Sequence, residues 1–168
     1  MRSVDEGEYL EFAARRAAAL YRSACLLSGG DTHLAEDLVQ ETLGRMYVHW
    51  HKAAAADNPA GYAHTVLVRA FLSHRRKRSS TETPREELPD AVTAEGDATV
   101  RIVLLDALGQ LTPRDRAVLV LRYWEDRSVE ETAQALRLSP GAVRTRCSRA
   151  LERLRGVLGD SLPELSRL

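Results

Sequence analysis

The segment from Ser128 to Leu158 constrains the fold most, because it has the pattern of two short helices joined by a tight turn. Ser128 and Glu131 have the spacing of a capping box, in which each side chain accepts a hydrogen bond from an unpaired backbone N–H. We expect this helix to end near Leu136. Ser139-Pro140 then starts a second helix, with a capping hydroxyl before a proline whose missing N–H costs nothing there.

The second helix combines an apolar stripe with a cationic face. Its apolar residues recur at steps of three and four, which predicts one buried side: Val143, Cys147, Leu151, Leu154 and Leu158. At about 100° per residue, the side chains pointing away are Thr145, Arg146, Ser148, Arg149 and Arg153, flanked by Arg144 and Arg155. Such a helix suits the DNA major groove. The alternative is a solvated face in an ordinary bundle.

Composition indicates a helical protein with no membrane-spanning segment. The 168 residues are 29% charged and only 5% aromatic, and Ala, Leu and Arg are abundant, which favours helices. Cys25 and Cys147 each lie within an apolar helical pattern, so we expect buried thiols rather than a disulfide or a metal site. The N-terminus has no apolar signal core. We therefore expect a cytoplasmic protein.

Charge is sorted along the chain although its net value is zero. One basic cluster consists of Arg69, Arg75, Arg76, Lys77 and Arg78, and the arginines of the second helix form another. One acidic cluster consists of Asp31, Glu36, Asp37 and Glu41. Between 79 and 98 the acids Glu82, Glu86, Glu87, Asp90, Glu95 and Asp97 face only Arg85. Such sorting indicates different partners for different surfaces.

The helical patterns predict an all-α fold of two small domains joined by a flexible acidic linker. Helices are expected over 8–27, from residue 31 or 32 to Trp50, over 59–78, over 99–111 and over 112–124, before the final pair. Residues 1–78 then form one domain, 79–98 the linker and 99–168 a helix–turn–helix domain. Most apolar residues of 59–78 share one side, but Val68 and Leu72 lie on the other. We expect Tyr47, Trp50, Tyr123 and Trp124 in the core.

Two separated stretches resemble the extracytoplasmic-function sigma factors of bacterial RNA polymerase, with an actinobacterial character. The first is Ala35-Glu-Asp-Leu-Val-Gln-Glu-Thr42 followed by Asn58-Pro-Ala-Gly-Tyr62. The second runs from Leu111-Thr-Pro-Arg-Asp-Arg116 through Ser128-Val-Glu-Glu-Thr-Ala133 to Gly141-Ala-Val-Arg-Thr-Arg146. Both stretches stand in the family's order. The resemblance implies a promoter-specificity subunit that binds RNA polymerase core and directs transcription initiation.

The resemblance also implies roles for residues. Asp37, Gln40 and Glu41 would bind the clamp of the polymerase's largest subunit, and the flap is a further contact of the core. The minus-ten promoter element would be held by Arg69, Arg75, Arg76, Lys77 and Arg78. The minus-thirty-five element would be read by Arg144, Thr145, Ser148 and Arg149, with Arg146 and Arg153 on phosphates. An anti-sigma factor is a common partner in the family, and we expect a monomer when free.

The chain departs from the family pattern at three positions. Arg69 stands where members often have asparagine, Ser73 where they often have an acid, and Arg137 where many such turns have glycine. These changes affect base identity at the minus-ten element and the geometry of the turn.

Two other classes of function are alternatives for such a chain. One is a stand-alone helix–turn–helix regulator, which would bind promoter duplex without polymerase and would need a self-complementary dimer interface. The other is an enzyme, for which the sequence has no phosphate-binding glycine loop, no HExxH pair and no nucleophile elbow. His49 and His51 are two residues apart and diverge on a helix. We expect no catalysis, no metal and no cofactor.

Overall fold

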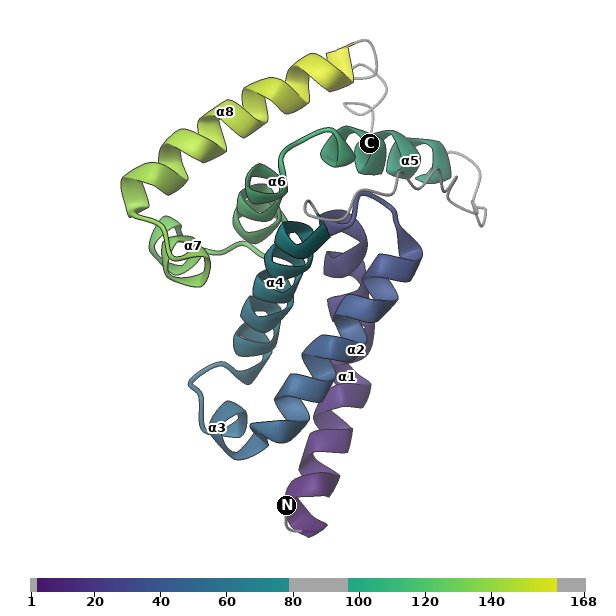
Figure 1. Ribbon diagram of the computed structural model, residues 1–168, viewed down its shortest axis with the longest axis vertical. Coiled ribbons are helices and arrows are strands. Elements are labelled where there is room, and N and C mark those ends of the chain that lie inside the picture. The colour runs from purple at the N-terminus through teal and green to yellow at the C-terminus, as the bar shows by residue number, and fades with distance from the viewer. Residues whose placement is uncertain (1–2, 79–96, 160–168) are drawn as a thin grey trace.

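The computed structural model describes residues 3–78 and 97–159, and every regular element in these ranges is helical (Figure 1). The first half contains α1 (Ser3–Leu27), α2 (Thr32–Val48), α3 (Trp50–Ala54) and α4 (Pro59–Arg78). The second half contains α5 (Asp97–Gly109), α6 (Pro113–Leu119), the π-helix η1 (Val120–Trp124), α7 (Val129–Leu136) and α8 (Pro140–Leu158). The predicted all-α class is confirmed. The predicted linker lies outside the described residues except for Asp97 and Ala98, which begin α5.

The helix starts follow from capping side chains in the sequence. At the start of α7, Ser128 Oγ accepts from the Glu131 N–H at 3.0 Å, and the Glu131 carboxylate accepts from the Ser128 N–H at 3.4 Å. Ser139 Oγ caps α8 by accepting from the Ala142 N–H at 3.1 Å. Asp31 caps α2 and Thr112 caps α6 in the same way. Each cap satisfies a donor that the first helical turn leaves unpaired.

The first half has its core between α1, α2 and α4. Leu20, Leu38 and Leu67, one from each helix, are fully buried or nearly so. Near the other end of α1, the Tyr9 hydroxyl donates to the Leu43 carbonyl at 2.8 Å. Trp50 is buried as expected, but Tyr47 is 41% exposed, so its predicted core position is wrong. Tyr47 packs against Tyr9 in a T-shaped arrangement, with ring centroids 5.1 Å apart.

The second half contains the predicted helix–turn–helix. Val143, Cys147 and Leu158 of α8 are buried, and Leu151 and Leu154 pack against the core at partial exposure. Both cysteines are free and buried, as expected.

Tyr123 and Trp124 are exposed at 59% and 55%, so their predicted core positions are wrong. They lie in η1, where the Glu125 N–H donates to the Val120 carbonyl, five residues back. The extra residue in this turn rotates both rings away from the side that an α-helical period of 3.6 places in the core.

The two halves pack directly against each other, which the sequence patterns did not predict. α4 lies between α1 and α2 on one side and α6 and α7 on the other (Figure 1). Val68 lies about 100° around α4 from Leu67, and both are fully buried. The second apolar side of α4 noted in the sequence therefore belongs to the interface between the halves.

Arg116 of α6 is 2% exposed and joins the halves at this interface. Its guanidinium donates to the Leu27 carbonyl at the end of α1 at 2.6 Å and to the Leu108 carbonyl near the end of α5 at 2.7 Å. It also donates to the carbonyls of Gly109 and Leu111. The C-terminal ends of two helices carry partial negative charge, which stabilises a buried cation.

Candidate functional site

The acidic side chains of α2 lie on the surface of the first half. Asp37, Gln40 and Glu41 are exposed, and their spacing of three and four residues places them on one face. Glu41 forms an ion pair with Arg45 at 2.6 Å. Both partners remain about half exposed, so this pair is a weak, solvated one. The face can accept hydrogen bonds and ion pairs from a basic partner.

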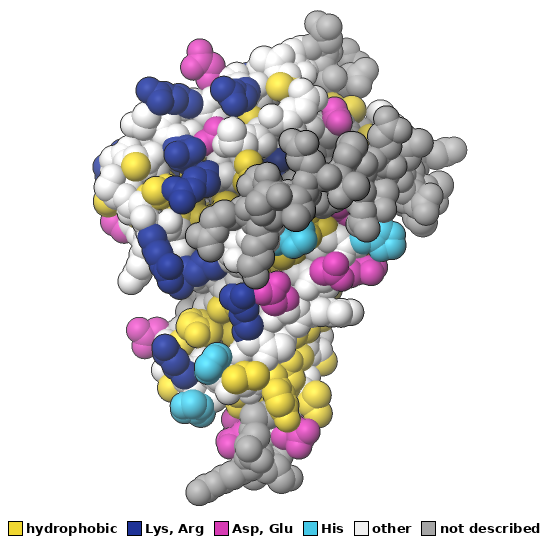
Figure 2. Space-filling view, in the orientation of Figure 1, with side chains coloured by type: hydrophobic (Ala, Val, Ile, Leu, Met, Phe, Trp, Pro, Cys, Tyr) yellow, Lys and Arg dark blue, Asp and Glu magenta, His cyan; other side chains and the backbone are white. Residues whose placement is uncertain are grey.

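The cationic face of α8 is exposed as the sequence predicted. Thr145, Ser148 and Arg149 point to solvent, together with Arg144 and Arg153. Lys and Arg side chains gather over this part of the molecule, where α8 and α7 lie (Figure 2). A cleft of about 480 Å³ beside the helix is lined by Thr112, Asp115, Gly141, Ala142, Thr145, Arg146, Arg149 and Arg153.

Two arginines of α8 already have acidic partners. Arg146 donates to Asp115 at 3.0 Å and is partly buried, whereas Arg144 approaches Glu130 at 3.7 Å with both side chains well exposed. Arg149 and Arg153 form no ion pair with any residue in the described part of the chain. Among the arginines that point away from the apolar stripe of α8, these two are the most available for phosphates or base edges.

The basic cluster predicted for the minus-ten element is divided by the structure. Arg75, Arg76, Lys77 and Arg78 end α4, but their side chains lie outside the described residues. Arg69 is half-buried. Its guanidinium donates to the carbonyls of Ala135 at 3.0 Å and Gln134 at 3.3 Å, both in α7. Burial, and then the nearby charge of Arg137, lower the pKa of Arg69.

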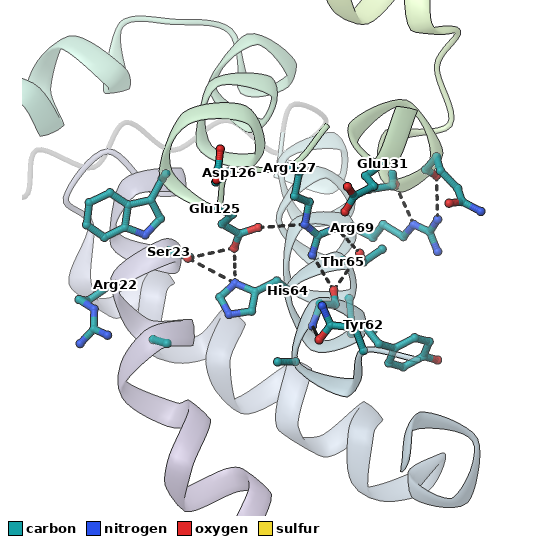
Figure 3. A pocket seen from close by; sticks show the side chains of 18 residues that line it. Arg22, Ser23, Tyr62, His64, Thr65, Arg69, Glu125, Asp126, Arg127 and Glu131 are labelled. Atoms are coloured by element: carbon teal, nitrogen blue, oxygen red, sulfur yellow. Dashed lines mark hydrogen bonds and ion pairs between the residues drawn. The ribbon is translucent and has the colours of Figure 1, made fainter. Parts of the chain in front are cut away.

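A cleft of about 830 Å³ lies between the halves, bounded by α1, α4, η1 and α7 (Figure 3). At its base, His64 of α4 contacts the Glu125 carboxylate, which is 8% exposed. Ser23 of α1 donates to the same carboxylate at 3.1 Å. Arg127 donates to the Gly61 carbonyl at 2.6 Å and to Thr65 Oγ1 at 2.8 Å. The sequence did not predict this cluster, because no local pattern pairs side chains so distant along the chain.

Ser23, His64 and Glu125 are the residue types of a hydrolase triad, but their geometry differs from one. In a triad the serine and the acid face opposite nitrogens of the imidazole, so that the ring can take the serine proton. Here Ser23 Oγ, at 3.4 Å, and Glu125 both face His64 Nδ1. The serine donates to the carboxylate instead. The cluster therefore holds the halves together and does not activate a nucleophile.

Metal and membrane features are absent from the described ranges. Within residues 3–78 and 97–159, no three side chains of His, Cys, Asp or Glu are grouped to hold a metal ion. No helix in those ranges is both long enough and apolar enough to span a bilayer.

The fold is that of a helical protein with a helix–turn–helix, and it exposes a cationic face on α8 and a separate acidic face on α2. Residues 12–81 match the family model Sigma-70 region 2, and residues 101–154 match Sigma-70, region 4. The RNA polymerase sigma-E factor of Streptomyces avermitilis is 40% identical over 152 residues, spanning 88% of this chain and 83% of the relative. The ECF RNA polymerase sigma factor SigL of Mycobacterium tuberculosis is 35% identical, spanning 86% and 85%.

A solved structure supports the fold. The sigma factor RpoE of Bartonella quintana, crystallised with the anti-sigma factor NepR, superimposes with a TM-score of 0.70, covering 90% of this chain and 97% of that one at 24% identity. The chain belongs to the extracytoplasmic-function group of sigma-70 factors. Members of this family bind RNA polymerase core and promoter DNA, and they direct transcription initiation.

Proposed function

We propose that this promoter-specificity subunit uses three surfaces, one for each of its binding contacts. The exposed acidic face of α2 binds the clamp of the polymerase's largest subunit through Asp37, Gln40 and Glu41. The basic side and end of α4 hold the minus-ten element. The cationic face of α8 reads the minus-thirty-five element. The observation that carries the proposal is the match to both sigma regions, with the α2 face and the α8 face each exposed on its own part of the fold.

On α8, groove contacts belong to Arg144, Thr145, Ser148 and Arg149. Their exposure and their place on one side of the helix support this assignment. Arg153 anchors a phosphate from the same cleft. Arg146 must leave its ion pair with Asp115 before it can bind a phosphate, so it contributes less to DNA affinity than Arg153 does.

On α4, the basic end from Arg75 to Arg78 supplies phosphate contacts, supported by its lack of any acid from Gly61 to Ser80 in the sequence. Arg69 joins this surface only when it is released from α7. The protein performs no chemistry of its own, acts in the cytoplasm with the polymerase, and is a candidate partner of an anti-sigma factor.

The polymerase contact is tested by run-off transcription with purified Streptomyces core polymerase on a template pool with a randomised upstream region. Asp37→Lys combined with Glu41→Lys is expected to abolish promoter-dependent transcripts, because like charges then oppose the basic partner. The matched control is Glu8→Lys with Glu11→Lys, which makes the same charge change on exposed positions of α1. If the α2 variant transcribes as well as this control, the assigned polymerase face is wrong.

The minus-thirty-five contact is tested on the promoter selected from that pool. Arg149→Ala is expected to lower selection of that promoter over scrambled DNA by roughly 5- to 150-fold, the value of one well-placed base contact. Arg155→Ala on the same helix removes an exposed cation outside the assigned surface and should leave selection unchanged. Equal selection by both variants would contradict the groove assignment.

A further inference from the structure

The contact between the halves conflicts with simultaneous recognition of two promoter elements. Arg69 of α4 lies within hydrogen-bond distance of α7, and α7 packs against α8, so both DNA-reading helices belong to one compact body. Two DNA sites one and a half to two helical turns apart are separated by roughly 50–70 Å. Packed helices are separated by only about 8–10 Å, and α7 alone stands between α4 and α8 in this chain of contacts. The described conformation therefore cannot place α4 and α8 on both elements at once.

The interface has the features of a specific contact. Gly29 and Gly109 approach so closely that a Cβ at Gly29 would lie 2.9 Å from the Gly109 Cα. A side chain at position 29 would therefore force the two backbones apart. Val68 and Phe71 of α4 are fully buried, and the Arg116 guanidinium that donates to the Gly109 carbonyl lies over the Phe71 ring.

Polar side chains cross the interface in both directions (Figure 3). Glu125 and Arg127 from the second half reach His64, Thr65 and the Gly61 carbonyl in α4. Arg69 reaches back from α4 to two carbonyls of α7. The Arg69 guanidinium therefore connects α4 to the second half through two hydrogen bonds.

We propose that the free chain is closed by a latch formed by Arg69, Glu125 and Arg127, and that this closed form keeps α4 from minus-ten DNA until polymerase binding separates the halves. The inference rests on the proposed function of α4. In the closed form, the Arg69 guanidinium donates to two carbonyls of α7. Arg69 is the one residue of the predicted minus-ten cluster whose side chain is described. Opening releases this guanidinium and uncovers the side of α4 that carries Thr65 and Arg69.

A reversible disulfide tests whether opening is required. A Cβ at Gly30 would lie 3.6 Å from the Leu105 Cβ across the interface, within the usual range of about 3.5–4.5 Å for a disulfide. The variant Gly30→Cys with Leu105→Cys is made in the full chain, whose own two thiols are buried. We expect oxidation to reduce run-off transcription at least tenfold and dithiothreitol to restore it. The single variants, treated identically, control for strain at Gly30, whose φ is +91°.

Equal transcription by the oxidised and reduced double variant would overturn the latch, because a locked chain would then be functional. No transcription by the wild-type chain would overturn the proposed function itself, and this inference with it. The reduced variant and the wild type thus separate the two failures.

Small-angle X-ray scattering tests whether the free chain is closed. The oxidised double variant provides the reference radius of gyration for the closed form. We expect the wild type to match it within about 1 Å and Arg127→Ala to exceed it by several ångströms, since two separated domains have a larger radius than one compact body. Arg15→Ala, which removes a solvated arginine from α1, should match the wild type. A wild-type radius several ångströms above the locked reference would overturn the proposal.

Discussion

Arg137 occupies the most strained backbone position of the turn between α7 and α8. Its φ of 55° and ψ of 44° lie in the left-handed region, where a side chain costs roughly 1–2 kcal/mol compared with glycine. We expect Arg137→Gly to raise the free energy of unfolding by about 1 kcal/mol, less than the full strain because glycine also gains freedom in the unfolded chain. Urea unfolding followed by circular dichroism measures this change.

The control for this prediction is the same substitution in a helix. Arg144→Gly lies within α8 and should lower the free energy of unfolding by about 1 kcal/mol, because glycine is unfavourable in a helix interior. If both variants are destabilised equally, the left-handed turn is not the source of strain at Arg137.

Cys25 and Tyr9 make the free energy of unfolding depend on pH in the alkaline range. Burial raises the pKa of the Cys25 thiol and that of the Tyr9 hydroxyl above their ordinary values. Once the pH approaches those ordinary values, the unfolded chain loses protons that the folded chain keeps, so the free energy of unfolding falls as pH rises. At about pH 7 and below, both groups are protonated in both states, and their contribution is constant.

Tyr9→Phe separates the two effects of the hydroxyl. The variant loses the hydrogen bond to Leu43 and should be less stable by about 1 kcal/mol at pH 7. Its stability should also fall less steeply than that of the wild type as pH rises beyond 10, when both are measured by urea unfolding. An unchanged slope in this pH range would contradict the assigned titration of Tyr9.

At the level of elements, the capping box is the clearest determinant of α7. Ser128→Ala removes the acceptor for the Glu131 N–H and should lower the free energy of unfolding by about 1 kcal/mol. Ser148→Ala, in the exposed interior of α8, removes a hydroxyl with no capping role and should change stability by less than about 0.5 kcal/mol. Thermal unfolding compares the two, and equal loss would show that the cap is unimportant.

Helix starts were predictable from sequence because a cap is made by residues three positions apart. Thr112, Ser128 and Ser139 all cap the helices expected of them. The π-helical turn at Val120–Trp124 was not predictable, since a helical period of 3.6 contains no signal for one extra residue. That turn reversed the predicted burial of Tyr123 and Trp124, and it also directs Glu125 toward α4.

At the level of the whole molecule, sequence periodicity identified each helix's apolar side but not its neighbour. Val68 and Leu72 fell outside the main stripe of α4, and this irregularity was the one local sign of a second packing partner. The acidic face of α2 and the cationic face of α8 were foreseen because exposed charge leaves a simple helical pattern. The contact between His64 and Glu125 was not foreseen, because only the folded chain brings these two residues together.

Arg116 shows how one buried cation makes the two halves depend on each other. Its guanidinium donates to carbonyls of α1 and α5, so its removal leaves buried acceptors unpaired in both halves. We expect Arg116→Met to lower the free energy of unfolding by several kcal/mol, about 1–3 kcal/mol for each buried carbonyl that is left without a donor. Arg114→Met, an exposed position on the same helix, should cost less than about 0.5 kcal/mol. Urea unfolding measures both variants.

Because the lost contacts lie in both halves, the α1 and α5 amides of Arg116→Met should both lose hydrogen-exchange protection, and loss in α5 alone would contradict the link.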